Sequence, residues 1–158
     1  MAYTNIDDPS AHFQSLVYAG TGGDAGASQP TTHTNTGNSD LQPDLIWFKD
    51  RGAAYSHYLV DSSRGRAKGL KSDTTAAETT SGQTGWDLVS FDSDGFKVGA
   101  PSEGNSTNGG TTSKVAWQWK CNGGTTATNT TGSLNSVVQV NTTAGFSIVT
   151  WTGAGGVR

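Results

Sequence analysis

The sequence is poor in cysteine, in charge and in residues that favour helices. Cys121 is the only cysteine among 158 residues, so no disulfide can form within the chain, and we expect a small, half-buried residue after a strand. Charged residues make up 15% of the chain, below the roughly 25% of ordinary soluble domains. No window of about 12 residues has a clean apolar repeat of 3.6 residues, which argues against an all-α fold.

Signals for nucleic acid, membrane and export are also missing. A net charge of −3 provides no basic surface for nucleic acid. No apolar run approaches the roughly 18 residues of a membrane helix, and the N-terminus lacks the charged start and apolar stretch of a signal peptide. We therefore expect a protein made in the cytoplasm without an export signal, with no nucleic-acid or membrane partner.

Glycine and short apolar runs are abundant instead. There are 22 glycines, about twice the usual frequency of roughly 7%, and Thr, Ser and Asn crowd the segments between the apolar runs. This composition is typical of short strands joined by many turns, and the length fits one domain. The pattern predicts an all-β sandwich or barrel with strands at 13–19, 45–49, 56–61, 88–92, 96–98, 114–120, 136–140 and 146–152.

Three of these runs carry more detail. Residues 114–120 alternate, which places Val115, Trp117 and Trp119 on one face that we expect to be core. Residues 45–48 show no alternation, which is typical of a central strand covered on both faces. Asp94-Gly95 between two apolar runs predicts a hairpin of 88–91 with 96–98.

The remaining segments are predicted to be irregular. Residues 1–12 form an extended N-terminal arm with a turn at Pro9. The polar stretches 20–40, 72–85 and 101–113 are predicted as long loops, and 62–70 as one weak helical turn.

Two distant segments of the chain resemble each other. Residues 12–23 (HFQSLVYAGTGG) match residues 145–156 (GFSIVTWTGAGG), with Phe13 opposite Phe146 and Tyr18 opposite Trp151. Residues 13–144 are therefore predicted as the β domain, and 145–158 either as its closing strand beside 13–19 or as the start of a second repeat.

Catalytic and metal-binding patterns are not found. His12, His33 and His57 are scattered, and no nucleophile motif or phosphate loop is present, so we predict no catalytic residue, no metal and no cofactor. Asp92 and Asp94 fit a hairpin turn better than a calcium loop. Asp87 paired with either of them remains open as a carboxylate pair for glycoside cleavage, since folding and not spacing makes that geometry.

Charged residues at two strand ends leave another alternative open. Asp50 and Arg51, together with Asp61 and Arg64, either form ion pairs across neighbouring strand ends or are solvated loop charges, and the second interpretation is favoured.

Trp86 is the aromatic residue with the most polar surroundings. It follows Gln83 and precedes Asp87 in a stretch without apolar neighbours. An exposed indole offers a flat apolar face and one N–H donor, so this loop is a candidate contact for a sugar or a protein.

Taken in order, several motifs resemble a repeated domain of virion proteins from marine bacteriophages, cyanophages among them. The motifs are YTNIDDPS at 3–10 with Phe13, DLQPDLIWFKDR at 40–51, DSSRG at 61–65, SDGF at 93–96, VAWQWK at 115–120 and GFSIVTWTG at 145–153. The resemblance spans nearly the whole chain. Members of this family are commonly longer, carry the domain in tandem and are described as structural or fibre-like.

The resemblance implies a lectin-like jelly-roll β-sandwich and a non-enzymatic structural role in a tail fibre or a capsid-attached fibre, on the surface of the virion. It implies contacts with other virion proteins and with further copies of the chain, as a homotrimer. The arm would then anchor the chain through Tyr3, Asn5, Ile6, Asp7, Asp8 and Pro9. Alternatives are a receptor-binding lectin that touches host glycans through Trp86, Asp87 and Gln83, and, less favoured, a glycan depolymerase.

Overall fold

The chain folds into antiparallel β-structure. The computed structural model describes residues 6–21, 30–80, 88–99 and 107–155. These parts contain no α-helix and one short 3-10 helix, η1 (Pro9–Ala11), which confirms the all-β prediction. The strands are β1 (Phe13–Ala19), β2 (Thr31–Thr34), β3 (Leu45–Asp50), β4 (Tyr58–Asp61), β5 (Lys68–Leu70), β6 (Thr79–Thr80), β7 (Leu88–Asp92), β8 (Gly95–Val98), β9 (Ser113–Trp119), β10 (Ala127–Asn129), β11 (Ser136–Asn141) and β12 (Phe146–Trp151).

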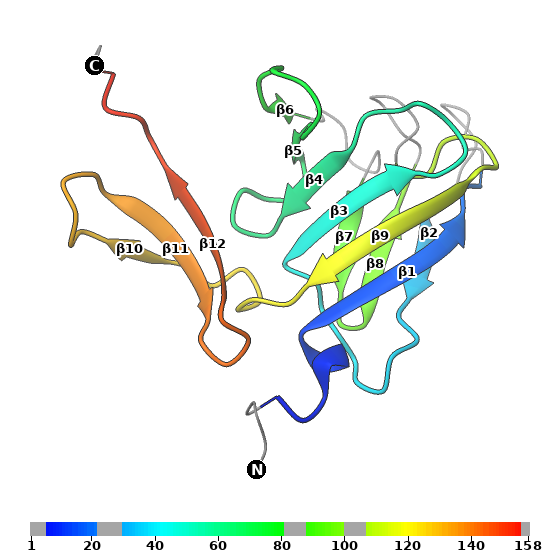
Figure 1. Ribbon diagram of the computed structural model, residues 1–158, viewed down its shortest axis with the longest axis horizontal. Helices are drawn as coiled ribbons and strands as arrows, with labels where there is room; N and C mark the ends of the chain where they lie inside the picture. Colours follow the sequence, from blue (N-terminus) through cyan, green and yellow to red (C-terminus); the bar gives the residue numbers. More distant parts are fainter. Residues whose placement is uncertain (1–5, 22–29, 81–87, 100–106, 156–158) are drawn as a thin grey trace.

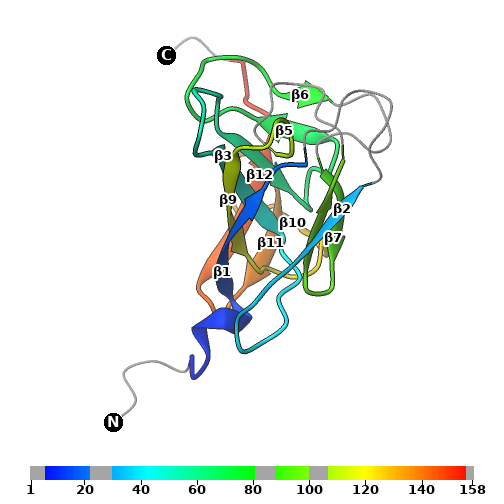
Figure 2. The ribbon, with the colours of Figure 1, turned by 90° about the vertical axis from the view of Figure 1, so that its right-hand side faces the viewer.

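The strands form three sheets, which we name by their position. The large sheet has the order β1-β9-β3-β4-β5-β6, the core sheet β2-β8-β7 and the C-terminal sheet β10-β11-β12. In Figure 1 the C-terminal sheet stands beside the large sheet, while Figure 2 shows the core sheet facing one side of it. Strands β1 and β12, which carry the two similar segments, therefore belong to different sheets, with β1 paired to β9 and β12 to β11.

The hydrophobic core lies between the large sheet and the core sheet. Phe48 of β3 meets Phe96 of β8 edge to face, with ring centroids 5.3 Å apart, and Tyr18 of β1 meets the same ring at 5.6 Å. Aromatic pairs in this arrangement contribute about 0.5–1.5 kcal/mol beyond their buried area. The other buried members of the core are Ile46, Tyr58, Val60, Leu88, Val98 and Ala116.

Glycine is required where Tyr58 of β4 packs across β5. A Cβ atom at Gly69 would lie 2.0 Å from the ring carbon Cζ of Tyr58, so only a residue without a side chain fits under this core ring. The second such position is Gly95, which has φ of 114° and closes the turn between β7 and β8. The predicted hairpin is thereby confirmed.

The central position of residues 45–50 is also confirmed. Strand β3 lies between β9 and β4, with Ile46 and Phe48 fully buried. Leu45, Trp47 and Lys49 are half-buried on the opposite face, so both faces are covered in part.

The predicted core face of β9 is wrong. Ala116 faces the core together with the fully buried polar side chains of Lys114 and Gln118, while Trp117 and Trp119 are half-buried on the other face of the large sheet. The alternation was real, but the polar face is the buried one, because Lys114 Nζ and Gln118 Nε2 each donate a hydrogen bond to a side chain inside the fold.

Four strands lie outside the predicted runs. Strands β2, β5, β6 and β10 are short and rich in Thr or other polar residues, and they are held by backbone pairing to a neighbour. β2 and β6 fall within stretches predicted as loops. The helical turn predicted at 62–70 is wrong, since its last three residues form β5. Parts of the three predicted loops, residues 22–29, 81–85 and 101–106, lie outside the described residues.

Candidate functional site

The predicted contact residues are only partly placed by the structure. Trp86, Asp87 and Gln83 lie outside the described residues, as do Tyr3 and Asn5 of the predicted anchor. The other predicted anchor residues, Ile6 to Pro9, are described.

The root of the arm is tied to the loop before β3. Asp8 caps η1 by accepting hydrogen bonds from Ser10 N (2.9 Å) and Ser10 Oγ (2.6 Å), and it also accepts one from Ser39 Oγ (2.7 Å). These bonds hold the pKa of Asp8 below its usual value, with the Ser10 hydroxyl as the largest cause. Asp8 is thus part of the fold.

An aromatic groove opens beside this root. It has a volume of about 360 Å³ and is lined by Ile6, Pro9, His12, Phe13, Trp119, Ala144 and Phe146. Trp119 stacks on Phe146 with ring centroids 6.3 Å apart and meets Phe13 at 5.0 Å. The two phenylalanines of the internal echo therefore flank one tryptophan. Such rings can hold an apolar or planar partner, and only the echo pointed to Phe13 and Phe146 in advance.

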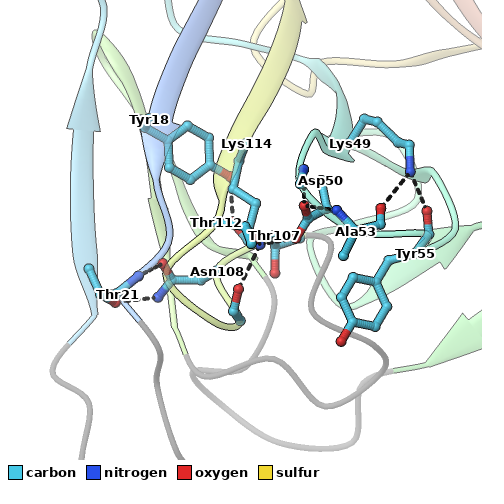
Figure 3. Close-up of polar contacts among 12 residues, drawn as sticks. Tyr18, Thr21, Lys49, Asp50, Ala53, Tyr55, Thr107, Asn108, Thr112 and Lys114 are labelled. Carbon is cyan, nitrogen blue, oxygen red and sulfur yellow. Dashed lines mark hydrogen bonds and ion pairs between the residues drawn. The ribbon is translucent and has the colours of Figure 1, made fainter.

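The most distinctive polar cluster is buried at the other end of β3 and β9 (Figure 3). Lys114 Nζ donates to a carboxylate oxygen of Asp50, to Gly109 O (2.6 Å) and to Thr112 Oγ1 (2.8 Å), so its three protons are all committed. Both side chains of the ion pair have no exposed surface.

Asp50 accepts further hydrogen bonds around the same centre. Gly52 N and Ala53 N donate to its Oδ1 at 2.7 and 3.0 Å, and Thr112 Oγ1 donates to its Oδ2 at 2.6 Å. Burial alone would raise the pKa of Asp50, but the hydrogen bonds from Lys114, Thr112 and Gly52 outweigh it and leave the pKa below its usual value. Both oxygens of Asp50 and all three donors of Lys114 are therefore hydrogen-bonded inside the fold.

Tyr18, which lies beside this cluster, adds a further buried hydrogen bond. Tyr18 Oη donates to Thr107 O at 2.5 Å, and burial, together with the Asp50 charge, raises the pKa of Tyr18 far above its usual value. Asn108 bonds to Thr21 and to Gly99 O. Residues 107–112 are therefore fastened to the ends of β1, β3 and β9 (Figure 3).

The charged residues at the two strand ends, for which the sequence favoured exposure to solvent, differ in their partners. Arg64 does pair with Asp61 (2.6 Å) and also with Glu78 (2.8 Å), so the solvated interpretation is wrong there. Asp50 has Lys114 as its ionic partner, and Arg51 instead donates to Ser113 Oγ.

A second buried carboxylate joins the C-terminal sheet to the large sheet. Asp44 accepts hydrogen bonds from Ser62 Oγ (2.6 Å), Cys121 N (2.6 Å), Gly123 N (3.1 Å) and Gly124 N (3.0 Å). Gln139 of β11, fully buried, adds bonds with this same turn and with Ser62 and Ser63. The spacing of residues in the sequence did not predict this contact between the two sheets, which we call the Asp44 joint. Cys121 is buried within it, in keeping with its predicted role as a packing residue, and burial raises the pKa of its thiol.

A second groove, also of about 360 Å³, separates β12 from the large sheet. Its lining includes Leu59, Asp61, Arg64 and Val149, and Trp151 lies on its rim with 65% of its surface exposed. Sequence reasoning noted Trp151 only as the match of Tyr18 and missed its exposure.

The described ranges contain neither a metal-binding cluster nor a membrane-spanning helix. No group of three or more His, Cys, Asp or Glu side chains could hold a metal ion among residues 6–21, 30–80, 88–99 and 107–155. In the same ranges there is no helix with the length and hydropathy needed to cross a bilayer.

Comparison with known proteins gives one match. No curated protein and no solved structure matches the chain. One family model, described as a domain of unknown function (DUF7483), matches residues 8–157. That match takes in η1, all three sheets and both buried carboxylate clusters, and the chain belongs to this family.

Proposed function

We propose that the chain is a non-enzymatic structural module of a bacteriophage virion, part of a tail fibre or of a fibre attached to the capsid. In this role it contacts other virion proteins and further copies of itself at the particle surface. We also propose that the large sheet and the core sheet form a lectin-type jelly-roll sandwich.

The observation that carries the proposal is the character of the C-terminal part. Residues 121–157 contain no Asp, Glu, Lys or Arg, and within them Val140, Val149 and Trp151 are exposed. Proteins that remain single in solution cover their surface with mixed charges and keep apolar patches small. An uncharged surface with exposed valines and a tryptophan fits a protein that is embedded in an assembly.

The resemblance in sequence to virion proteins adds support, because its motifs contain the residues that form the buried polar contacts between strands and sheets. The motif at 40–51 holds both Asp44 and Asp50, and the motif at 61–65 holds the Asp61–Arg64 pair. The motif at 145–153 contains β12. What resembles the virion proteins is therefore the set of residues that builds this architecture.

The test is to locate the protein in the particle. Phage encoding this chain would be purified on a density gradient, and the chain detected by immunoblot and by immunogold labelling. We expect it in the particle fraction with label on tail or capsid. Its recovery wholly in the soluble lysate would contradict the proposal.

The anchor is tested separately, in the full chain. Deleting the whole arm would remove Asp8 and its bonds to Ser39, so substitutions are the sharper tool. The double variant Tyr3→Ala, Asn5→Ala is expected to stay folded and to lose incorporation into particles. The matched control is Ser72→Ala, Asp73→Ala in an exposed turn, which should incorporate normally. Equal incorporation of both variants would refute the anchor assignment.

A further inference from the structure

His33 of β2 packs against aromatic rings of the hydrophobic core. Its imidazole ring lies on Tyr18 of β1, with ring centroids 4.0 Å apart and planes tilted by 39°, and it meets Phe96 of β8 at 5.4 Å. In the register of the core sheet, His33 stands directly opposite Phe96. The histidine therefore completes a cluster of three rings that joins β1 to the core sheet.

One nitrogen of this histidine has no hydrogen-bond partner. His33 Nε2 is buried, and it forms no hydrogen bond within the described part of the chain. The neutral ring can leave Nε2 without a hydrogen, so that only an unused lone pair is buried. Protonation of the ring would place a hydrogen on Nε2 and a positive charge beside the rings of Tyr18 and Phe96, with no acceptor for the new N–H group.

Among the described residues, no charged side chain of the strands around His33 compensates for such a proton. Strands β1 and β2 carry no charged residue, and burial keeps Tyr18 neutral by raising its pKa far above the usual value. On β8, Lys97 lies on the face turned away from the core, since successive residues of a strand point to opposite faces. Beyond Tyr18, the carboxylate of Asp50 is already paired with Lys114. Burial is accordingly the cause that lowers the pKa of His33.

Strand β2 depends on this side chain because little else holds it. Within the described ranges it is an edge strand of the core sheet and pairs with β8 alone. Its other residues are threonines that are half-buried or exposed. The segment after β2 is fastened more firmly, since Asn35 donates to Leu41 O and accepts a hydrogen bond from Gln118 Nε2. An edge strand held in this way can open locally while the rest of the domain stays folded.

We propose that His33 makes β2 a pH-sensitive edge of the core sheet: the neutral ring holds the strand against Tyr18 and Phe96, and protonation releases it while the large sheet stays folded. Release uncovers the ring of Phe96 and leaves one edge of β8 free to pair with another strand. This inference concerns the purified chain and does not require the proposed virion role.

The direction of the pH effect follows from the difference in proton affinity between the closed and the open strand. In the closed strand the pKa of His33 lies below its ordinary value of 6.5, so the open strand binds the proton more readily. The contribution of His33 to closure is therefore complete above pH 6.5, and it is lost as the pH falls below 6.5 and through the lower pKa of the closed state. Between about pH 7.5 and pH 5, one such site can shift the opening equilibrium by at most about thirtyfold.

The test is amide hydrogen exchange of the full chain at about pH 7.5, 6.5 and 5, with each rate corrected for the intrinsic exchange rate at that pH. We expect the protection of the amides in residues 31–34 to fall by several-fold to about thirtyfold across this range, while β3 and β9 change by less than about threefold. Constant protection in β2 would overturn the proposal. An equal fall in every strand would also overturn it, because the whole domain and not one strand would then respond.

The variant His33→Phe keeps an aromatic ring in the cluster and removes the titrating nitrogens. Its β2 protection should be independent of pH over the same range. His12 and His57 are unchanged in this variant, so a response that they cause would persist. A folded His33→Phe chain that is as sensitive to pH as the wild type would therefore refute the assignment to His33.

A second measurement does not depend on any variant. The imidazole ¹⁵N chemical shifts of His33 in the wild type would be followed against pH by NMR. We expect an unprotonated Nε2 at neutral pH and a titration midpoint below 6.5. A midpoint at or above 6.5 would show that the rings of Tyr18 and Phe96 stabilise the cation, and the proposal would then be wrong.

Discussion

Lys114 and Asp50 stand opposite each other in the register of β9 and β3 and form an ion pair that is fully buried. Among the described residues, each charge is compensated by the other and by hydrogen bonds with Thr112, Gly109, Gly52 and Ala53. Removing one charge leaves its partner buried and uncompensated, whereas replacing both does not.

The first prediction concerns this pair. Lys114→Met should lower the free energy of unfolding by about 3–5 kcal/mol, and the double variant Asp50→Asn, Lys114→Met should recover part of the loss. Urea denaturation measures both values. The control Lys68→Met, at a partly exposed position, should change stability by less than about 1 kcal/mol. A Lys114→Met effect as small as that of the control would contradict the structure.

The second prediction concerns the stability of the fold at low pH. The pKa of Asp50 in the folded chain lies below its ordinary value of 3.8, so the unfolded chain binds this proton more readily. The stabilisation that ionised Asp50 gives to the fold is therefore complete at a pH above 3.8, the pKa of Asp50 in the unfolded chain. It is lost as the pH falls below 3.8 and through the lower pKa that Asp50 has in the folded chain. Urea midpoints measured across this range should fall more steeply for the wild type than for Asp50→Asn. Parallel curves would show that Asp50 does not contribute.

The third prediction concerns the joint at Asp44. Asp44→Asn removes charge-assisted acceptors from three backbone N–H groups and should cost about 1.5–3 kcal/mol. Amide hydrogen exchange should become faster chiefly in residues 121–141, while β3 stays protected. Asp40→Asn, at an exposed position, is the control and should leave exchange unchanged. Uniformly faster exchange over the whole domain would argue against a local joint.

The fourth prediction concerns Gly69. Gly69→Ala forces the Tyr58 ring out of its place in the core and should destabilise the domain by about 1–3 kcal/mol, as measured by thermal unfolding. Gly132→Ala is the comparison, because a Cβ there meets no atom closer than 3.8 Å. Equal stability of the two variants would mean that the ring relaxes without cost.

The fifth prediction follows from the proposed non-enzymatic role. Incubation of the purified chain with polysaccharide from the host surface should leave the chain length of the polymer unchanged by size-exclusion chromatography. Shortening of the polymer that disappears in Asp87→Ala or Asp94→Ala would instead establish a depolymerase. Within the fold, Asp94 accepts a hydrogen bond from Leu41 N, so Asp94→Ala needs a folding control.

Much of the β pattern could be predicted from the sequence because apolar runs and turn residues are local signals. The runs at 13–19 and 88–92 match β1 and β7, and the Asp94-Gly95 turn closes the expected hairpin. β2 and β10 were missed since their residues are mostly polar and are half-buried or exposed, and pairing with β8 and β11 makes them strands.

The orientation of β9 could not be predicted from the same signals. Burial of Lys114 depends on Asp50, which is 64 residues away in sequence, and burial of Gln118 depends on Asn35, 83 residues away. Hydrophobicity alone therefore assigned the tryptophans to the core. The joint at Asp44 escaped prediction for the same reason, since its partners at 121–124 are backbone groups with no side-chain signature.

The lack of charge between residues 121 and 157 also determines how contacts made by this region respond to salt. Ionic strength weakens an interface by screening the attraction between opposite charges, and here there is no such attraction to screen. Burial of valine and tryptophan is instead favoured by salts that are excluded from protein surfaces. An assembly joined by the C-terminal sheet would keep its strength from dilute buffer to concentrated brine, and would be dissolved by detergent or urea sooner than by sodium chloride.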